Sequence, residues 1–225
     1  MSSESSSSLS RRGEAPEDNF TDEQLAVLID IAFVLSALSA LGSLFIVVSY
    51  FKFQRLHTFA FKLILWLAFA NIGLDAAYLM GDAGGHGDTE FKCYVQGIMR
   101  VWFALVGFAL TTAIVGSCYL MIVRRSFAIQ DRLPLVLACS VGVPLGMSLL
   151  PLITDSYGDA GAWCSITSTD LTTATWGTVW RFAIIYVPLW LAVLVNFWMY
   201  FRVSQALRSL ETAAASAYRE EGGGG

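Results

Sequence analysis

The residues CYVQGIMRVWFALVGFALTTAIVGSCYLMIVRR, numbers 93–125, decide the fold of this chain. Between Val101 and Val123 they contain no charged side chain. A helix of about twenty apolar residues, rising ~1.5 Å per residue, crosses the ~30 Å hydrocarbon core of a bilayer. Cys93 lies at one end, and Arg124–Arg125 lie at the other, where basic residues favour the cytoplasm. The stretch therefore predicts a central transmembrane helix with Cys93 outside, where thiols are able to pair.

The composition is typical of a helical membrane protein with several spans. Of the 225 residues, 56% are hydrophobic and only 14% are charged, and the mean hydropathy is +0.59. A soluble domain would carry about 25% charged residues. The four cysteines are too few for a disulfide scaffold, and none lies in a CxxC or other metal-ligand spacing. The sequence thus predicts an all-α protein embedded in membrane lipid, and we expect no cofactor, metal ion or nucleic acid.

Five apolar runs are long enough to cross a membrane. We expect spans at residues 25–50, 59–80, 95–123, 133–153 and 180–201, which together form a transmembrane bundle over 25–203. Residues 1–24 are polar and serine-rich, so we expect a disordered extracellular tail. The alanine-rich residues 204–225 are expected to form a cytoplasmic helical extension with a glycine-rich end.

The distribution of basic residues predicts that the N-terminus lies outside. In that topology the inner segments hold nine of them: Lys52, Arg55, Lys62, Arg124, Arg125, Arg132, Arg202, Arg208 and Arg219. The outer segments hold five: Arg11, Arg12, Lys92, Arg100 and Arg181. This bias follows the positive-inside rule. The same topology places outside the sequon Asn19-Phe20-Thr21, in which Asn19 is a candidate for glycosylation.

Charged and aromatic residues near the outer ends of the spans are candidates for a ligand site. Asp75 lies within a span, where an unpaired charge costs at least ~2.5–3.5 kcal/mol, so it should face the bundle interior. Arg100 and Arg181 lie at the outer ends of their spans. An arginine guanidinium group is able to bind a phosphate or carboxylate group with two hydrogen bonds. With the rings of Trp102 and Trp180, they suggest a small anionic, nucleotide-like ligand. In the alternative, Arg100 pairs with Asp75, and Arg181 reaches lipid phosphates.

Five motifs occur together in this chain. They are FAFKLILWLAFANI at 59–72, GD at 81–82, CYVQG at 93–97, WC at 163–164 and YVPLWLAVLVNFWMYFRV at 186–203. In order and spacing they resemble the cyclic-AMP-receptor-like group of G-protein-coupled receptors, over roughly residues 25–210. The resemblance implies a seven-transmembrane-receptor-like helical bundle in the plasma membrane. It also implies a small extracellular ligand and a heterotrimeric G protein as partners.

The resemblance assigns roles to two pairs of residues. In the family, the cysteine that opens the third helix forms a disulfide with the cysteine of the second outer loop. These positions fall on Cys93 and Cys164. The family places a basic pair, which meets the G protein, at the inner end of the third helix. That pair falls on Arg124 and Arg125.

Two departures from the family pattern stand out. The acidic position of the second helix falls on Asn71, so an ion site there would require Asp75 to take over the role. Such receptors have seven spans, whereas five are found in this sequence. We therefore expect a receptor that lacks helices six and seven.

Other functional classes fit the residues less well. A small transporter or channel subunit would need charges on several helices and usually an inverted repeat, whereas only Asp30 and Asp75 are acids within spans. A retinal-binding light sensor would need a lysine in mid-span. The lysines lie at or near membrane edges: Lys52, Lys62 and Lys92. An enzyme is disfavoured because His57 and His86 lie in loops and no HExxH or nucleophile constellation occurs.

Overall fold

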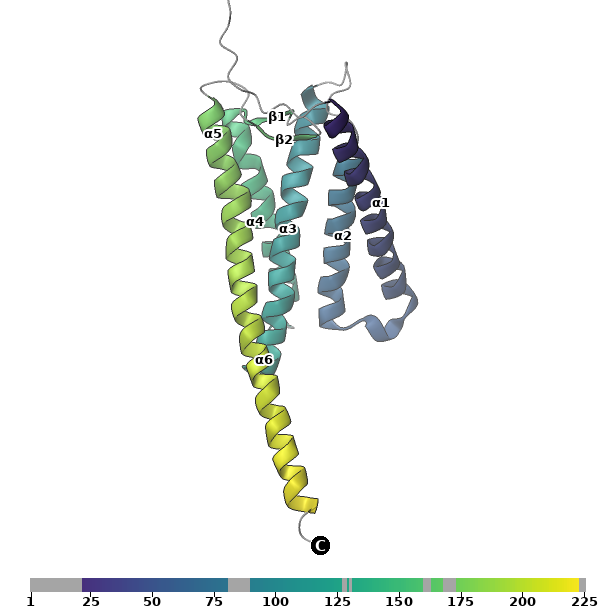
Figure 1. Cartoon of the computed structure of the whole chain (residues 1–225), viewed down its shortest axis with the longest axis vertical. Helices are drawn as coiled ribbons and strands as arrows, with labels where there is room; N and C mark the ends of the chain where they lie inside the picture. Colours follow the sequence, from purple (N-terminus) through teal and green to yellow (C-terminus); the bar gives the residue numbers. More distant parts are fainter. Residues whose placement is uncertain are drawn as a thin grey trace, which may run out of the picture.

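The computed structural model describes residues 22–80, 90–126, 129, 131–159, 163–167 and 173–222. Within these ranges the longer helices are α1 (Asp22–Lys52), α2 (Phe59–Leu79), α3 (Glu90–Ile122), α4 (Leu133–Leu149), α5 (Thr173–Trp180) and α6 (Val187–Gly222). The shorter elements are the 3₁₀ turns η1 (Gln54–Leu56) and η2 (Leu150–Thr154), the π-helix η3 (Arg181–Tyr186), and the strands β1 (Tyr157–Asp159) and β2 (Cys164–Ile166). Figure 1 shows a bundle of helices that run roughly along the long axis of the molecule, and the C-terminal part of α6 projects from it.

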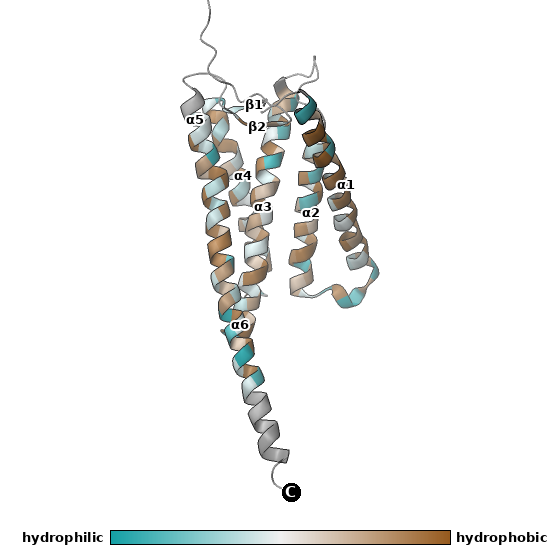
Figure 2. Ribbon diagram, viewed as in Figure 1, coloured by the Kyte–Doolittle hydropathy of each residue, from teal (hydrophilic) through white to brown (hydrophobic). Residues whose placement is uncertain are grey.

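Five helical segments are long and apolar enough to span a membrane, as the sequence predicted. They are Ala26–Lys52, Phe59–Leu79, Phe91–Ile122, Leu133–Thr154 and Trp176–Thr212. The fifth segment exceeds the expected 180–201 because helix α6 continues without a break into the alanine-rich stretch. Helix α1 begins at Asp22, inside the expected tail, and Asn19 lies outside the described residues. Figure 2 shows hydrophobic residues along the spans, with hydrophilic ones near the turn after α1 and low on α6.

The spans are hydrophobic on their outer faces as well as inside. Phe45 on α1 is 73% exposed and Phe197 on α6 is 70% exposed. Water would penalise such faces, whereas lipid chains accept them at no cost. The chain is therefore an integral multi-pass membrane protein.

Helix α3 lies at the centre of the described bundle (Figure 1). It packs against α2, α4, α6 and both strands, whereas α1 packs against α2. One buried cluster joins α3 to the strands and η3 through Val101, Ile166 and Ile184. A second cluster joins α3 to α2 through residues that include Leu63 and Leu110.

A β-hairpin, which the sequence did not predict, lies beside the start of α3, at the end of the bundle where α1 and α5 also begin (Figure 1). We call this the outer end, and β1 with β2 the outer hairpin. The two strands pair antiparallel, with Tyr157 opposite Ile166 and Asp159 opposite Cys164. The buried Tyr157 hydroxyl donates to the Ser148 carbonyl oxygen at 2.7 Å. Burial raises the pKa of Tyr157, so this phenol stays protonated and remains a donor.

The fifth span changes its helical form beside Pro188. Proline has no N–H and cannot donate to the preceding turn. Residues Arg181–Tyr186 form the π-helix η3, and the N–H of Val187 bonds to the Phe182 carbonyl five residues back. The wider turn rotates Arg181 relative to the α-helical part that follows.

Gly73 permits the close approach of α2 and α3. A methyl group at this position would lie 2.4 Å from the nearest atom of the Phe103 ring. That ring stacks on Trp102 at 4.7 Å, so moving it away would break a second contact. The α2–α3 interface therefore depends on a residue without a side chain.

We expect Gly73→Ala to destabilise the bundle by about 1–3 kcal/mol through overpacking. Gly107→Ala is the matched control, because nothing lies within 4 Å of an added methyl there. The control should be neutral or stabilising by up to ~1 kcal/mol, since alanine favours helix. Thermal unfolding of the purified variants measures both. Equal melting temperatures for the two variants would contradict the close packing at Gly73.

Candidate functional site

The outer hairpin is covalently joined to the first turns of α3. A disulfide links Cys93 of α3 to Cys164 of β2, with their Cα atoms 5.2 Å apart and a sequence separation of 71. The pairing implied by the resemblance is thus present in the structure. In the loop-entropy account, a closed loop of this length stabilises a fold by about 2–5 kcal/mol.

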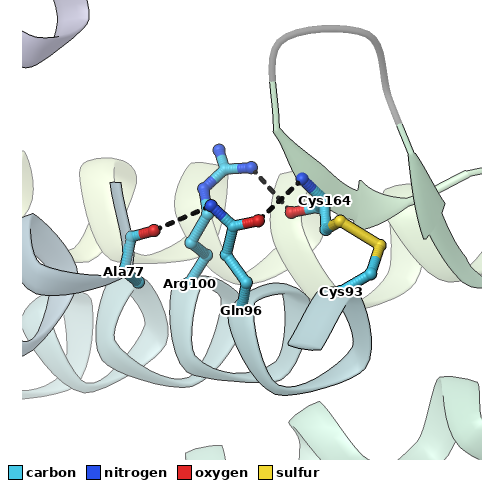
Figure 3. Close-up of a disulfide and its surroundings, with 5 residues drawn as sticks. All are labelled: Ala77, Cys93, Gln96, Arg100 and Cys164. Carbon is cyan, nitrogen blue, oxygen red and sulfur yellow. Dashed lines mark hydrogen bonds between the residues drawn. A yellow bond between two sulfur atoms is a disulfide. The ribbon is translucent and has the colours of Figure 1, made fainter. Parts of the chain in front are cut away.

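Two further side chains of α3 bind the backbone of Cys164 (Figure 3). Gln96 and Arg100 lie three and seven residues beyond Cys93, so all three share one face of the helix. The Cys164 N–H donates to Gln96 Oε1 at 3.3 Å, and Arg100 donates to the Cys164 carbonyl oxygen at 3.0 Å. Gln96 also donates to the Ala77 carbonyl oxygen of α2 at 2.9 Å. Helix α3 therefore binds the side chain, the amide and the carbonyl of a single residue.

Arg100 also lies against two aromatic rings. Its guanidinium carbon is 4.5 Å from the Tyr78 ring centre and 4.7 Å from the Trp163 ring centre, within the range of cation–π attraction. Its second terminal nitrogen donates to the Tyr78 hydroxyl at 3.1 Å. The Arg100 Nε is buried and has no hydrogen-bond partner. Arg100 lines a cavity of about 180 Å³ below the hairpin, which it shares with Tyr78 and Ser165.

Arg181, the first residue of η3 in the fifth span, binds the same strand, β2. It donates to the Ile166 carbonyl oxygen at 2.6 Å, and the neighbouring Trp180 donates to the Thr154 hydroxyl at 2.8 Å. Arg181 lines a separate cavity of about 580 Å³ with Phe182 and other residues of the fifth span. The structure therefore brings the two arginines to one strand and not to one cavity.

The aromatic neighbours of Arg100 differ from those that the sequence suggested. Trp102 lies two residues further along α3, which turns it to the opposite side of the helix. Its indole N–H donates to the Val141 carbonyl oxygen of α4 at 3.2 Å. Tyr78 and Trp163 occupy the place expected for Trp102 and Trp180.

Asp75 is buried, with 6% of its surface exposed. Its partner is the hydroxyl of Ser39 on α1, and its Oδ2 has none. The terminal nitrogens of Arg100 bind Cys164 and Tyr78, so the expected pair between Arg100 and Asp75 is not formed. Within the described ranges, no three His, Cys, Asp or Glu side chains gather closely enough to hold a metal ion.

The inner end of α3 carries the two basic residues expected there. Arg124 and Arg125 are both exposed, just beyond Ile122 where α3 ends. Arg125 adopts a left-handed conformation with φ of 50°, and the following N–H, of Ser126, bonds to the Leu120 carbonyl oxygen at 3.0 Å. Left-handed backbone costs a non-glycine residue about 1–2 kcal/mol, so this end of the helix is held in an unusual shape.

We expect Gln96→Leu to lower the melting temperature, because it leaves the buried Cys164 N–H and Ala77 carbonyl without their partner. Each such loss costs about 1–3 kcal/mol. The control is Gln205→Leu on the exposed face of α6, which makes the same chemical change without buried partners. Thermal unfolding in detergent or nanodiscs measures both. Equal melting temperatures for wild type and Gln96→Leu would show that these hydrogen bonds do not stabilise the protein.

Comparison with known proteins identifies the family of this chain. The family model for the slime mold cyclic AMP receptor matches residues 18–210. G-protein coupled receptor 1 of Arabidopsis thaliana is 30% identical over 179 residues, which are 80% of this chain and 52% of that relative. Cyclic AMP receptor-like protein A of Dictyostelium discoideum is 30% identical over 154 residues, covering 68% of this chain and 41% of that relative. The chain thus spans about half the length of the curated relatives it matches.

The fold has a solved counterpart in squid rhodopsin, with a TM-score of 0.69. That match covers 91% of this chain and 58% of the rhodopsin, and at 17% identity it shows the fold alone. The described helices therefore have a seven-transmembrane-receptor-like arrangement with five spans present. The relatives are named as receptors and not as enzymes. Because the family model matches most of its length, the chain belongs to the slime mold cyclic AMP receptor family of G-protein-coupled-receptor-like proteins.

Proposed function

We propose that this protein senses a small anionic ligand at the outer face of the plasma membrane and signals to a heterotrimeric G protein inside. The observation that carries the proposal is the charge distribution along α3. Arg100 lines a cavity at its outer end, and Arg124 and Arg125 are exposed at its inner end. Because α3 packs against α2, α4, α6 and the outer hairpin, a shift at one end is able to reach the other.

The unpaired Nε of Arg100 supports an anionic ligand. A buried donor without a partner is costly, and a phosphate or carboxylate oxygen would satisfy it. The name of the matching family refers to cyclic AMP, which is such an anion. We include in the proposal two further spans, since the curated relatives are about twice as long.

The ligand proposal predicts different effects for the two outer arginines. In a seven-helix form of the receptor, Arg100→Gln should weaken the binding of an anionic ligand such as a cyclic nucleotide by about 10–100-fold, the size of a lost charge-assisted hydrogen bond. Arg181→Gln is the matched control, because Arg181 also binds a β2 carbonyl but lines the other cavity. Radioligand binding measures both affinities. An equal loss in both variants would indicate disturbance of the hairpin, and no loss in either would exclude Arg100 from the site.

The signalling proposal is tested at the inner end of α3. Arg125→Gly removes the charge, and glycine adopts the left-handed backbone of this position without strain. It should therefore leave expression and ligand affinity intact while lowering receptor-catalysed nucleotide exchange by about tenfold, equivalent to ~1.4 kcal/mol. The control is Arg55→Ala in the exposed turn η1. Unchanged exchange in Arg125→Gly would show that this residue serves membrane topology and not the G protein.

A further inference from the structure

A further cavity shares Tyr78 with the Arg100 cavity. It has a volume of about 300 Å³ and is lined by α1, α2 and the ring of Trp163. Its polar residues are Ser36 and Ser39 of α1 and Asp75 of α2. The structure therefore presents two cavities at the outer end that share Tyr78, one lined by a guanidinium group and the other by a carboxyl group.

The carboxylate in this cavity is incompletely satisfied. Asp75 is only 6% exposed, and Ser39 is the partner of its carboxylate, yet Oδ2 makes no hydrogen bond. A buried carboxylate oxygen accepts hydrogen bonds only, so a donor or a cation is required to stabilise it. An unpaired acid that is buried within a membrane-spanning helix is costly to keep without such a partner.

The neighbouring groups favour a primary ammonium ion as that partner. An R–NH₃⁺ group has three donors. The cavity offers three acceptors on two helices: Asp75 Oδ2 and the hydroxyl oxygens of Ser36 and Ser39. Magnesium and calcium ions would require six or more oxygen ligands, and a quaternary ammonium ion has no N–H to donate.

The aromatic residues define where the rest of the ligand lies. Tyr78 and Trp163 meet edge to face with ring centres 5.6 Å apart, and both line the cavity. They offer an apolar surface to a short alkyl chain. Arg100 already lies over both rings from the α3 side, and its charge opposes a second cation bound through the rings. An ammonium ion would therefore depend on Asp75.

We propose that the cavity between α1, α2 and Trp163 binds the ammonium group of a primary amine through Asp75, with Ser36 and Ser39 accepting its remaining hydrogen bonds. The amine is either a small free molecule or the headgroup of an amine-bearing lipid. The residues of the site all lie in the described part of the chain, and the proposal does not depend on G-protein coupling or on an anionic ligand.

The test compares cations by thermal unfolding of the chain in phosphatidylcholine nanodiscs at constant ionic strength. Ethylammonium chloride should raise the melting temperature by about 2–4 °C, while sodium chloride and tetramethylammonium chloride should not. Asp75→Asn should weaken the apparent affinity for ethylammonium by about tenfold or more. Asp30→Asn, on the exposed face of α1, is the matched control and should respond as wild type. Equal shifts with all three salts, or an unchanged response in Asp75→Asn, would overturn the proposal.

A second variant tests the proposal even if Asp75→Asn misfolds. If Asp75→Asn fails to fold, Ser36→Ala with Ser39→Ala keeps the carboxylate and should still weaken the response to ethylammonium. Nanodiscs with phosphatidylethanolamine in place of phosphatidylcholine distinguish the two sources. A higher melting temperature in phosphatidylethanolamine that disappears in the double variant indicates a lipid headgroup, and a response to ethylammonium alone indicates a free amine. No response to either amine overturns the proposal.

Discussion

The outer end of this structure depends on the attachment of Cys164 to one face of α3. A two-stranded hairpin is marginally stable in isolation, because it buries little apolar surface and leaves strand edges unpaired. Here the disulfide fixes its position, and Gln96 and Arg100 satisfy the amide and the carbonyl of the same residue. Two residues later, Ile166 is fully buried against α3 and η3, and its carbonyl oxygen accepts from Arg181. The three residues of β2 thus hold the hairpin on the helices through a covalent bond, hydrogen bonds and apolar contacts.

This attachment explains how the outer charges are used. The sequence placed Arg100 and Arg181 at the membrane edge. The expected partners were a ligand or, in the alternative, Asp75 for Arg100 and lipid phosphates for Arg181. In the structure both donate to carbonyl oxygens of β2, so each connects the hairpin to a different span. The two interactions differ in one respect, since Arg100 retains a buried N–H without a partner. A ligand at Arg100 would therefore meet a residue that also determines the position of the hairpin.

The sequence predicted the features that depend on local composition. Hydropathy and length identified the five spans, and the resemblance supplied the partner of Cys93. The outer hairpin was missed because each strand has only three residues, too few to show an alternating pattern. Gln96 lies in the CYVQG motif, three residues after Cys93 and so on the same face of α3. Its hydrogen-bond partners, however, lie 19 and 68 residues away in sequence. Such pairings depend on tertiary packing, whereas helical geometry alone separates Trp102 from Arg100.

Hydrogen exchange of the hairpin tests the central claim most directly. Mass spectrometry of the nanodisc-embedded protein would follow the amides of residues 157–159 and 163–167 before and after reduction of the disulfide. We predict strong protection before reduction and a partial loss afterwards, because Gln96, Arg100 and Arg181 still bind β2. Exchange at the rate of an unstructured peptide with the disulfide intact would contradict the account. Complete loss of protection on reduction would show that the disulfide alone holds the hairpin on α3.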